Sequence, residues 1–185
     1  LALGDTATAR GSEAIALGFQ STASNSVAIA IGSGSDASGV NSTAVGAYSK
    51  SSGIGSAAFG SQNSALADSS AALGSFNTVA ANATSGVAIG SGNRSNAANG
   101  SALGVFNGAQ AANSTAVGYG NEAFGLRSLA LGHQSRAGGA DSIAIGSNID
   151  GNFGGAVTRE AKAIAIGADS EAFGEAIAMG AGAYA

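Results

Sequence analysis

The sequence contains no cysteine, no proline and no tryptophan. Without cysteine there is no disulfide scaffold, no thiolate metal site and no thiol nucleophile. Without proline, and without glycine at every third position, the chain cannot form a collagen helix. No run approaches the roughly 20 apolar residues that span a bilayer, and the first residues lack the regions of a signal peptide. The sequence starts with Leu1 inside a repeated motif, so we expect a fragment whose targeting and anchoring segments lie elsewhere.

Charge and aromatic side chains are also scarce. Charged residues make up 10% of the chain, against roughly 25% in a typical soluble domain. The net charge of −4 is too small for the self-repulsion that keeps disordered chains unfolded. Seven scattered Lys and Arg residues form no basic stripe, so a nucleic-acid partner is not expected. Alanine and glycine instead supply 44 and 31 of the 185 residues, which excludes an ordinary core of large side chains.

An internal repeat accounts for this composition. Alanine, an apolar residue and then glycine recur 13 times, and nine of the twelve spacings between these marker glycines are 14 residues. The exceptions are 16 residues before Gly90, 21 before Gly167 and 13 before Gly180. A fixed short period is the signature of a solenoid, in which each repeat forms one coil.

Each repeat predicts two short strands and two turns. Segments such as Ile143-Ala144-Ile145 alternate with period two, as a strand does. A second strand is expected four to five residues after the marker glycine, where a polar residue precedes Ala or Ser. The seventh residue after the marker is often glycine or asparagine, which suggests a turn with positive φ. We therefore predict an all-β parallel solenoid with two strands per coil and about 13 coils, as one repeat domain over residues 1–185.

So short a coil leaves little room between its two sheets. We expect the inward positions to hold only Ala, Ser, Asn and Gly, and the large apolar residues to point outward. A stripe of this length exceeds the apolar patch that a soluble monomer tolerates, so it predicts an interface between copies. The opposite orientation, with bulky residues inside and alanine at the interface, stays open at this point. The predicted interface residues directly precede the marker glycines: Leu17, Ile31, Val45, Phe59, Leu73, Ile89, Leu103, Val117, Leu131, Ile145, Ile166 and Met179.

The repeats resemble those of a known family. Asn41-Ser42-Thr43-Ala44-Val45-Gly46 and Asp141-Ser142-Ile143-Ala144-Ile145-Gly146 are similar to the head repeat of YadA-like trimeric autotransporter adhesins of Gram-negative bacteria. The resemblance covers essentially the whole chain. It implies a left-handed parallel β-roll, a parallel homotrimer, and attachment to host cells or extracellular-matrix proteins. It also implies a cell-surface location, with outer-membrane anchoring through C-terminal regions that are missing here.

The residues offer little for catalysis. His133 is the only histidine, and it follows a marker glycine in a predicted turn, where a solvated side chain is expected. One histidine and no cysteine supply neither a nucleophilic triad nor a zinc site. A ring of three His133 side chains could hold an ion in a trimer, but a turn facing away from the axis makes this a weak alternative. We therefore predict no enzyme activity, no metal and no cofactor.

Ligand contacts are expected instead at exposed aromatic residues and at the longest repeat. The excess residues of that repeat, near 150–160, predict a loop, and loops often carry function. A merely tolerated insertion remains the alternative for the loop, as packing between protomers does for the aromatic residues. The candidate binding residues are Tyr48, Phe76, Phe106, Tyr119, Phe153 and Arg159.

Three functions fit a regular solenoid. The first is an adhesin head, which binds strongly through many weak contacts. The second is an ice-binding array of threonines, which the mixed charges of the outward column disfavour, as at Asp36, Lys50 and Arg94. The third is a structural spacer within a longer surface fibre, with no ligand of its own.

Overall fold

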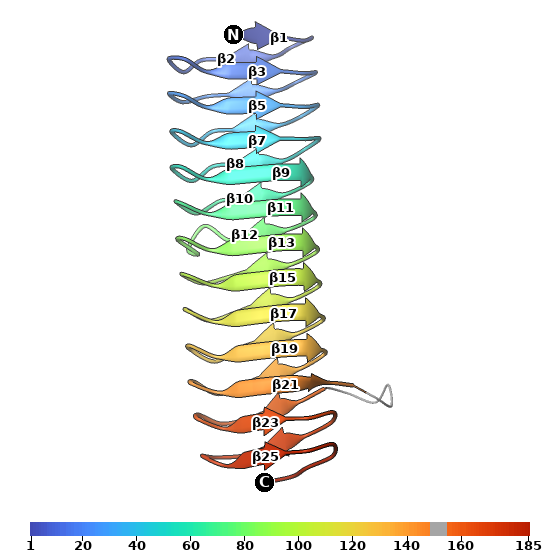
Figure 1. Ribbon diagram of the computed structural model, residues 1–185. Helices are drawn as coiled ribbons and strands as arrows, with labels where there is room; N and C mark the ends of the chain where they lie inside the picture. The colour runs from blue at the N-terminus through green and yellow to red at the C-terminus, as the bar shows by residue number, and fades with distance from the viewer. Residues whose placement is uncertain (149–154) are drawn as a thin grey trace. The chain divides into compact units, whose positions relative to one another are not determined.

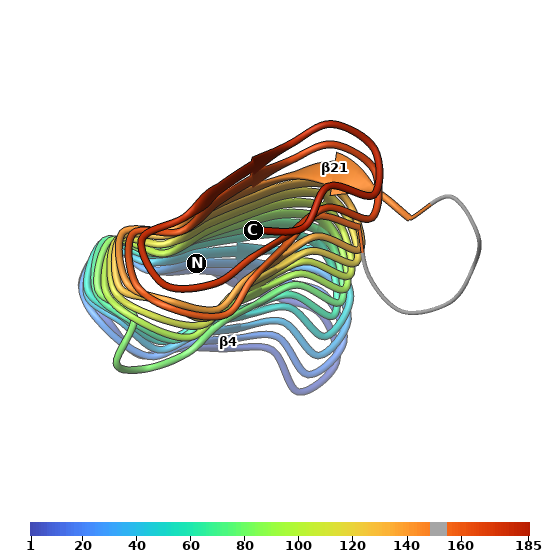
Figure 2. The same cartoon turned by 90° about the horizontal axis from the view of Figure 1, so that it is seen from below.

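The computed structural model describes residues 1–148 and 155–185. By its internal contacts the chain divides into two units, residues 1–92 (unit 1) and 93–185 (unit 2). Every regular element of the described residues is a β-strand. Figures 1 and 2 show that, within each unit, the chain winds through flattened coils with one strand on each side. The chain is a parallel β-solenoid of about 12 turns.

The odd-numbered strands form one sheet of each unit, here called the odd sheet, and pair in parallel in sequence order. In unit 1 they are β1 (Ala2–Leu3), β3 (Ile15–Leu17), β5 (Ile29–Ile31), β7 (Thr43–Val45), β9 (Ala57–Ser61), β11 (Ala71–Ser75) and β13 (Val87–Ser91). In unit 2 they are β15 (Ser101–Val105), β17 (Thr115–Tyr119), β19 (Leu129–His133), β21 (Ile143–Ser147), β23 (Ile164–Ile166) and β25 (Ile177–Met179).

The even-numbered strands form the opposite, even sheet and have two residues each. They also pair in parallel. Unit 1 contains β2 (Thr8–Ala9), β4 (Thr22–Ala23), β6 (Asp36–Ala37), β8 (Lys50–Ser51), β10 (Ser64–Ala65) and β12 (Thr78–Val79). Unit 2 contains β14 (Arg94–Ser95), β16 (Gly108–Ala109), β18 (Glu122–Ala123), β20 (Arg136–Ala137), β22 (Val157–Thr158) and β24 (Glu171–Ala172).

The interior is built from alanine. The alanine two residues before each marker glycine is at most 2% exposed from Ala16 to Ala178. Register keeps the column aligned, because Ala44 pairs with Ala58 and Val45 with Phe59. Successive strand residues point to opposite faces, so the residue after each alanine faces outward. The inward position of alanine is confirmed, and the opposite orientation is excluded.

Two interior residues are larger than expected. Val79 and Thr158 are 0% and 1% exposed, so the prediction that only Ala, Ser, Asn and Gly fit inside was wrong. Both lie in the two coils that exceed 14 residues. Where the preceding coil has the buried Ser70, the coil of Val79 has Gly86, and this smaller residue offsets the added volume. Thr158 satisfies its hydroxyl with Ser142 Oγ at 2.9 Å. The interior therefore restricts the summed volume of facing residues rather than each residue type.

The expected role of the glycines seven residues after the marker was also wrong. Gly11, Gly53 and Gly125 are not among the residues with positive φ. A Cβ atom at Gly11 would instead lie 1.9 Å from the carbonyl oxygen of Asn25, one coil later. Glycine is needed there because successive backbones stack too closely for any side chain.

Left-handed backbone occurs at two other places in the coil, two and nine residues after the marker. Non-glycine residues occupy most of these positions, including Tyr48 (φ 55°) and Phe106 (φ 55°) at the first and Val27 (φ 56°) at the second. Tyrosine, phenylalanine and valine are poor sequence signals for this conformation. The turns were therefore predicted in number, but their residues were not.

Candidate functional site

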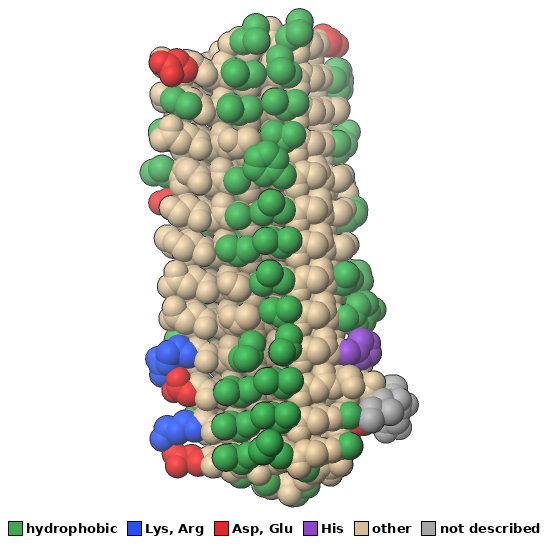
Figure 3. Space-filling view, in the orientation of Figure 1, with side chains coloured by type: hydrophobic (Ala, Val, Ile, Leu, Met, Phe, Trp, Pro, Cys, Tyr) green, Lys and Arg blue, Asp and Glu red, His purple; other side chains and the backbone are tan. Residues whose placement is uncertain are grey.

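The outward face of the odd sheet carries an apolar stripe. We define it as the predicted interface residues Leu17, Ile31, Val45, Phe59, Leu73, Ile89, Leu103, Val117, Leu131, Ile145, Ile166 and Met179. None of them is buried in the single chain, and Phe59, Ile89 and Met179 are 41%, 39% and 68% exposed. Figure 3 shows the hydrophobic side chains as a column on this face. The geometry offers a long apolar contact surface, as the sequence predicted.

The candidate aromatic residues of unit 1 are isolated. Tyr48 and Phe76 are 63% and 60% exposed. The ring of Tyr48 lies over Gly34, because a Cβ atom there would be 2.7 Å from Tyr48 Cδ1. Phe76 has no ring partner among the described residues. These two side chains are exposed as predicted, but the structure does not bring them together.

Unit 2 contains a ring cluster that the sequence analysis missed. Phe106 and Tyr119 contact each other edge to face, with ring centroids 6.3 Å apart, and Tyr119 stacks on His133 at 5.1 Å with an angle of 14° between the rings. His133 was expected to be merely solvated, yet it is part of this cluster. The signal was present in the sequence, because Tyr119 and His133 are one 14-residue period apart.

The longest repeat supplied the last two candidates. Phe153 lies outside the described residues, together with the rest of 149–154. Arg159 lies on the even sheet side, pairs with Glu171 and lies over the ring of Phe173 at 5.5 Å. Residues 155–158 belong to the coil, because Gly155 and Ala156 are buried and Val157 pairs with Arg136. Arg159 is thus a side chain engaged within the coil, not one extended from a loop.

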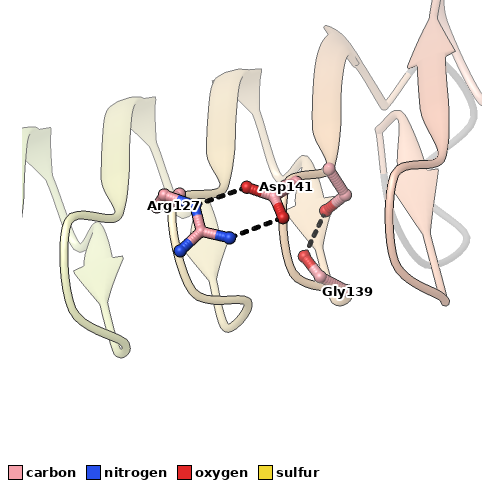
Figure 4. A network of polar contacts seen from close by, with 4 residues as sticks. Arg127, Gly139 and Asp141 are labelled. Atoms are coloured by element: carbon pink, nitrogen blue, oxygen red, sulfur yellow. Dashed lines mark hydrogen bonds and ion pairs between the residues drawn. The ribbon is translucent and has the colours of Figure 1, made fainter.

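One turn column of unit 2 carries alternating charges. Arg127 donates to both carboxylate oxygens of Asp141, at 2.6 and 2.7 Å (Figure 4). These hydrogen bonds lower the pKa of Asp141 and raise the pKa of Arg127. Lys162 donates to Glu175 at 2.6 Å, which raises the pKa of Lys162 and lowers that of Glu175. All four groups are solvent exposed, so these pairs contribute little to stability. They cancel charge along this edge.

No cluster of three or more His, Asp or Glu side chains suited to a metal ion occurs in residues 1–148 and 155–185. The same part of the chain has no helix of the length and apolarity needed to cross a membrane. The candidate sites are therefore the apolar stripe and the ring cluster, and both are contact surfaces.

Comparison with known families decides the identity. Residues 1–21, 9–35, 21–49, 51–77, 109–132 and 123–148 match the YadA head domain repeat, which together cover more than half of the chain. The chain belongs to the YadA head family. No curated protein matches it. YadA heads are parts of trimeric autotransporters, which are anchored in the outer membrane and exposed at the cell surface. Heads of this family are in general homotrimeric, adhesive and non-enzymatic.

Proposed function

We propose that three copies of this chain associate in parallel through their odd sheets and form the rigid head of a surface adhesin. The supporting observation is the apolar stripe, whose members stay accessible in a single chain. Burial of one such aliphatic side chain contributes about 1.5–3 kcal/mol. A dozen of them contribute enough to favour permanent assembly over a monomer that exposes the stripe to water.

In this proposal residues 1–185 act as one head domain, each coil is left-handed, and the head is held at the bacterial surface by regions C-terminal to it. The head attaches the cell to host surfaces or extracellular-matrix proteins. Each protomer presents the same surface, so one trimer offers three equivalent contacts to an extended partner. Linked contacts of this kind raise avidity over a single contact by about 10²–10⁴.

The proposal is tested by measuring attachment of the purified protein to cultured epithelial cells and to a panel of immobilised matrix proteins. The adhesin predicts saturable attachment that is lost when Ile145→Asp separates the trimer and retained in the matched variant Ile145→Leu. A well-formed trimer that attaches to no cell and no matrix protein would contradict the adhesin role and favour a structural spacer.

A further inference from the structure

Three rings meet at one edge of unit 2, and the coil register places them there. Tyr119 and His133 are the last residues of β17 and β19 and pair directly, and Val105 of β15 pairs with Tyr119. Phe106 follows Val105. The 14-residue period therefore brings residues from three successive coils into one row, here called the ring edge (Phe106, Tyr119 and His133).

The ring edge is a preformed and accessible surface. Phe106 and Tyr119 are 60% and 47% exposed, and the edge-to-face and stacked contacts described above hold the three rings together. Figure 3 shows the histidine side chain, in purple, at the right-hand edge of the view, away from the central hydrophobic column. The ring edge is thus distinct from the apolar stripe.

The coil does not require aromatic residues at these positions. Ser33, Ala47 and Ser61 occupy the position of Tyr119 in unit 1. Gln20 occupies the position of Phe106 with the same φ of 55°. Small or polar residues therefore close the same turn, so folding alone does not account for three adjacent rings.

Hydrogen bonds fix the backbone beneath the rings. The side chain of Asn107, next to Phe106, donates to the carbonyl oxygens of Leu103 and Gly118 at 2.9 and 2.7 Å. The backbone nitrogen of Gln134 donates to the carbonyl oxygen of Tyr119 at 2.8 Å. A surface that is already ordered loses little conformational entropy when it binds a partner.

The chemistry of the ring edge is neutral. In the coils of β15 to β21 the two residues after each marker glycine are Val105, Phe106, Tyr119, Gly120, His133, Gln134, Ser147 and Asn148, and none carries a formal charge at pH 7. The Tyr119 hydroxyl and the His133 imidazole provide hydrogen-bonding groups. Asn148 donates to Gln134 at 2.7 Å, which adds an amide pair beside the rings. A polyanionic partner would need Lys or Arg here, whereas a neutral sugar matches both the rings and the amides.

We propose that the ring edge binds neutral glycans of the host surface. The apolar C–H face of a hexopyranose packs against the exposed rings, and its hydroxyl groups exchange hydrogen bonds with Tyr119, His133 and the Gln134 amide. This inference rests on the proposed adhesin function and names the class of ligand that this surface of the head recognises.

The test is an NMR titration of the assembled protein with maltotetraose, cellotetraose and lacto-N-tetraose, with 3′-sialyllactose and heparin as charged comparisons. We expect at least one neutral oligosaccharide to shift the ring signals of Tyr119 and His133, and Tyr119→Ala to weaken its binding at least tenfold. The matched control is Tyr48→Gln, which removes an isolated ring and should leave the affinity unchanged. Both variants place residues found at the same position of other coils, namely Ala47 and Gln62.

The proposal is overturned if no neutral oligosaccharide shifts these signals, if only the charged compounds do so, or if Tyr119→Ala binds as tightly as the parent. Cell attachment measured in parallel separates the two proposals. Attachment that survives Tyr119→Ala removes the glycan site and leaves the adhesin role in place. A parent protein that attaches to no cell or matrix removes the adhesin role, whatever the NMR titration shows.

Discussion

Asn121 donates a hydrogen bond from Nδ2 to Oδ1 of Asn107, one coil earlier, at 2.9 Å. The backbone nitrogen of Asn121 donates to the same oxygen at 3.0 Å. Both side chains are buried, and Asn63 and Asn77 form the same arrangement in unit 1. The amides thus form a ladder through the interior that satisfies polar groups on successive coils. The coils of Asn63, Asn77, Asn107 and Asn121 have five-residue strands in the odd sheet, whereas those of Ser21, Ser35 and Ser49 have three.

The ladder gives the first prediction. Asn107→Asp replaces the Nδ2 donor by a carboxylate oxygen that faces the carbonyl oxygens of Leu103 and Gly118. We expect it to lower the free energy of unfolding by about 3 kcal/mol or more, because a buried charge loses its partners. Asn107→Ser should lower it by only about 1 kcal/mol, since serine occupies this position in other coils. Denaturant unfolding of both variants checks this, and equal losses would contradict it.

The narrow interior gives the second prediction. Ala144 is 0% exposed, whereas Ile145 faces outward on the same strand. Ala144→Leu adds three carbon atoms to a filled interior and should destabilise the fold by about 1–3 kcal/mol or more. Ile145→Leu conserves volume and should cost less than about 1.5 kcal/mol. Thermal unfolding of the pair provides the measurement, and indistinguishable melting temperatures would refute the narrow interior.

Two glycines in one turn give the third prediction. A Cβ atom at Gly118 would lie 2.0 Å from the carbonyl oxygen of Gly132, so Gly118→Ala forces adjacent coils apart. At Gly120 the nearest atom is Gln134 Cγ at 3.4 Å, and the φ of 64° matches that of glutamine at this position in other coils. Gly120→Gln should therefore cost no more than about 1–2 kcal/mol, and Gly118→Ala clearly more. The reverse order in a melting experiment would disprove the close backbone stacking.

The Arg127–Asp141 pair gives a prediction for pH. Because Arg127 lowers the pKa of Asp141 below its usual 3.8, the carboxylate stabilises the fold above that pH. The contribution is lost as the pH falls through the lower, folded-state pKa. We expect Asp141→Asn to lower the melting temperature slightly at pH 7 and not at pH 2. The control is Asp5→Asn, at a carboxylate with no ion pair among the described residues. A difference between Asp141→Asn and the parent that persists at pH 2 would argue against this linkage.

Much of the fold could be predicted from the repeat. The 14-residue spacing sets the coil, and the unvarying alanine beside a variable apolar residue distinguishes the inward Ala144 from the outward Ile145. The left-handed positions could not be predicted in this way, because Tyr48 and Val27 are forced into that backbone by stacking between coils rather than by their own preference. Val79 was missed for a similar reason, since its space is set by a glycine several residues later.

The candidate sites were predicted less completely. Tyr119 was selected as an exposed aromatic residue, but its stacking on His133 depends on register between coils, which a search for single residues does not use. Arg159 was assigned to a loop because the length of its repeat does not indicate where the extra residues leave the coil. Pairing of Val157 with Arg136 settles the position of that segment in the coil.

The mass of the protein in solution tests the central claim most directly. If the apolar stripe joins copies of the chain, light scattering will give three times the chain mass of 17.3 kDa, and Ile145→Asp will shift the mass toward one chain because it places a carboxylate within the stripe. A stable, folded monomer at micromolar concentration, with the same mass for parent and variant, would contradict the account.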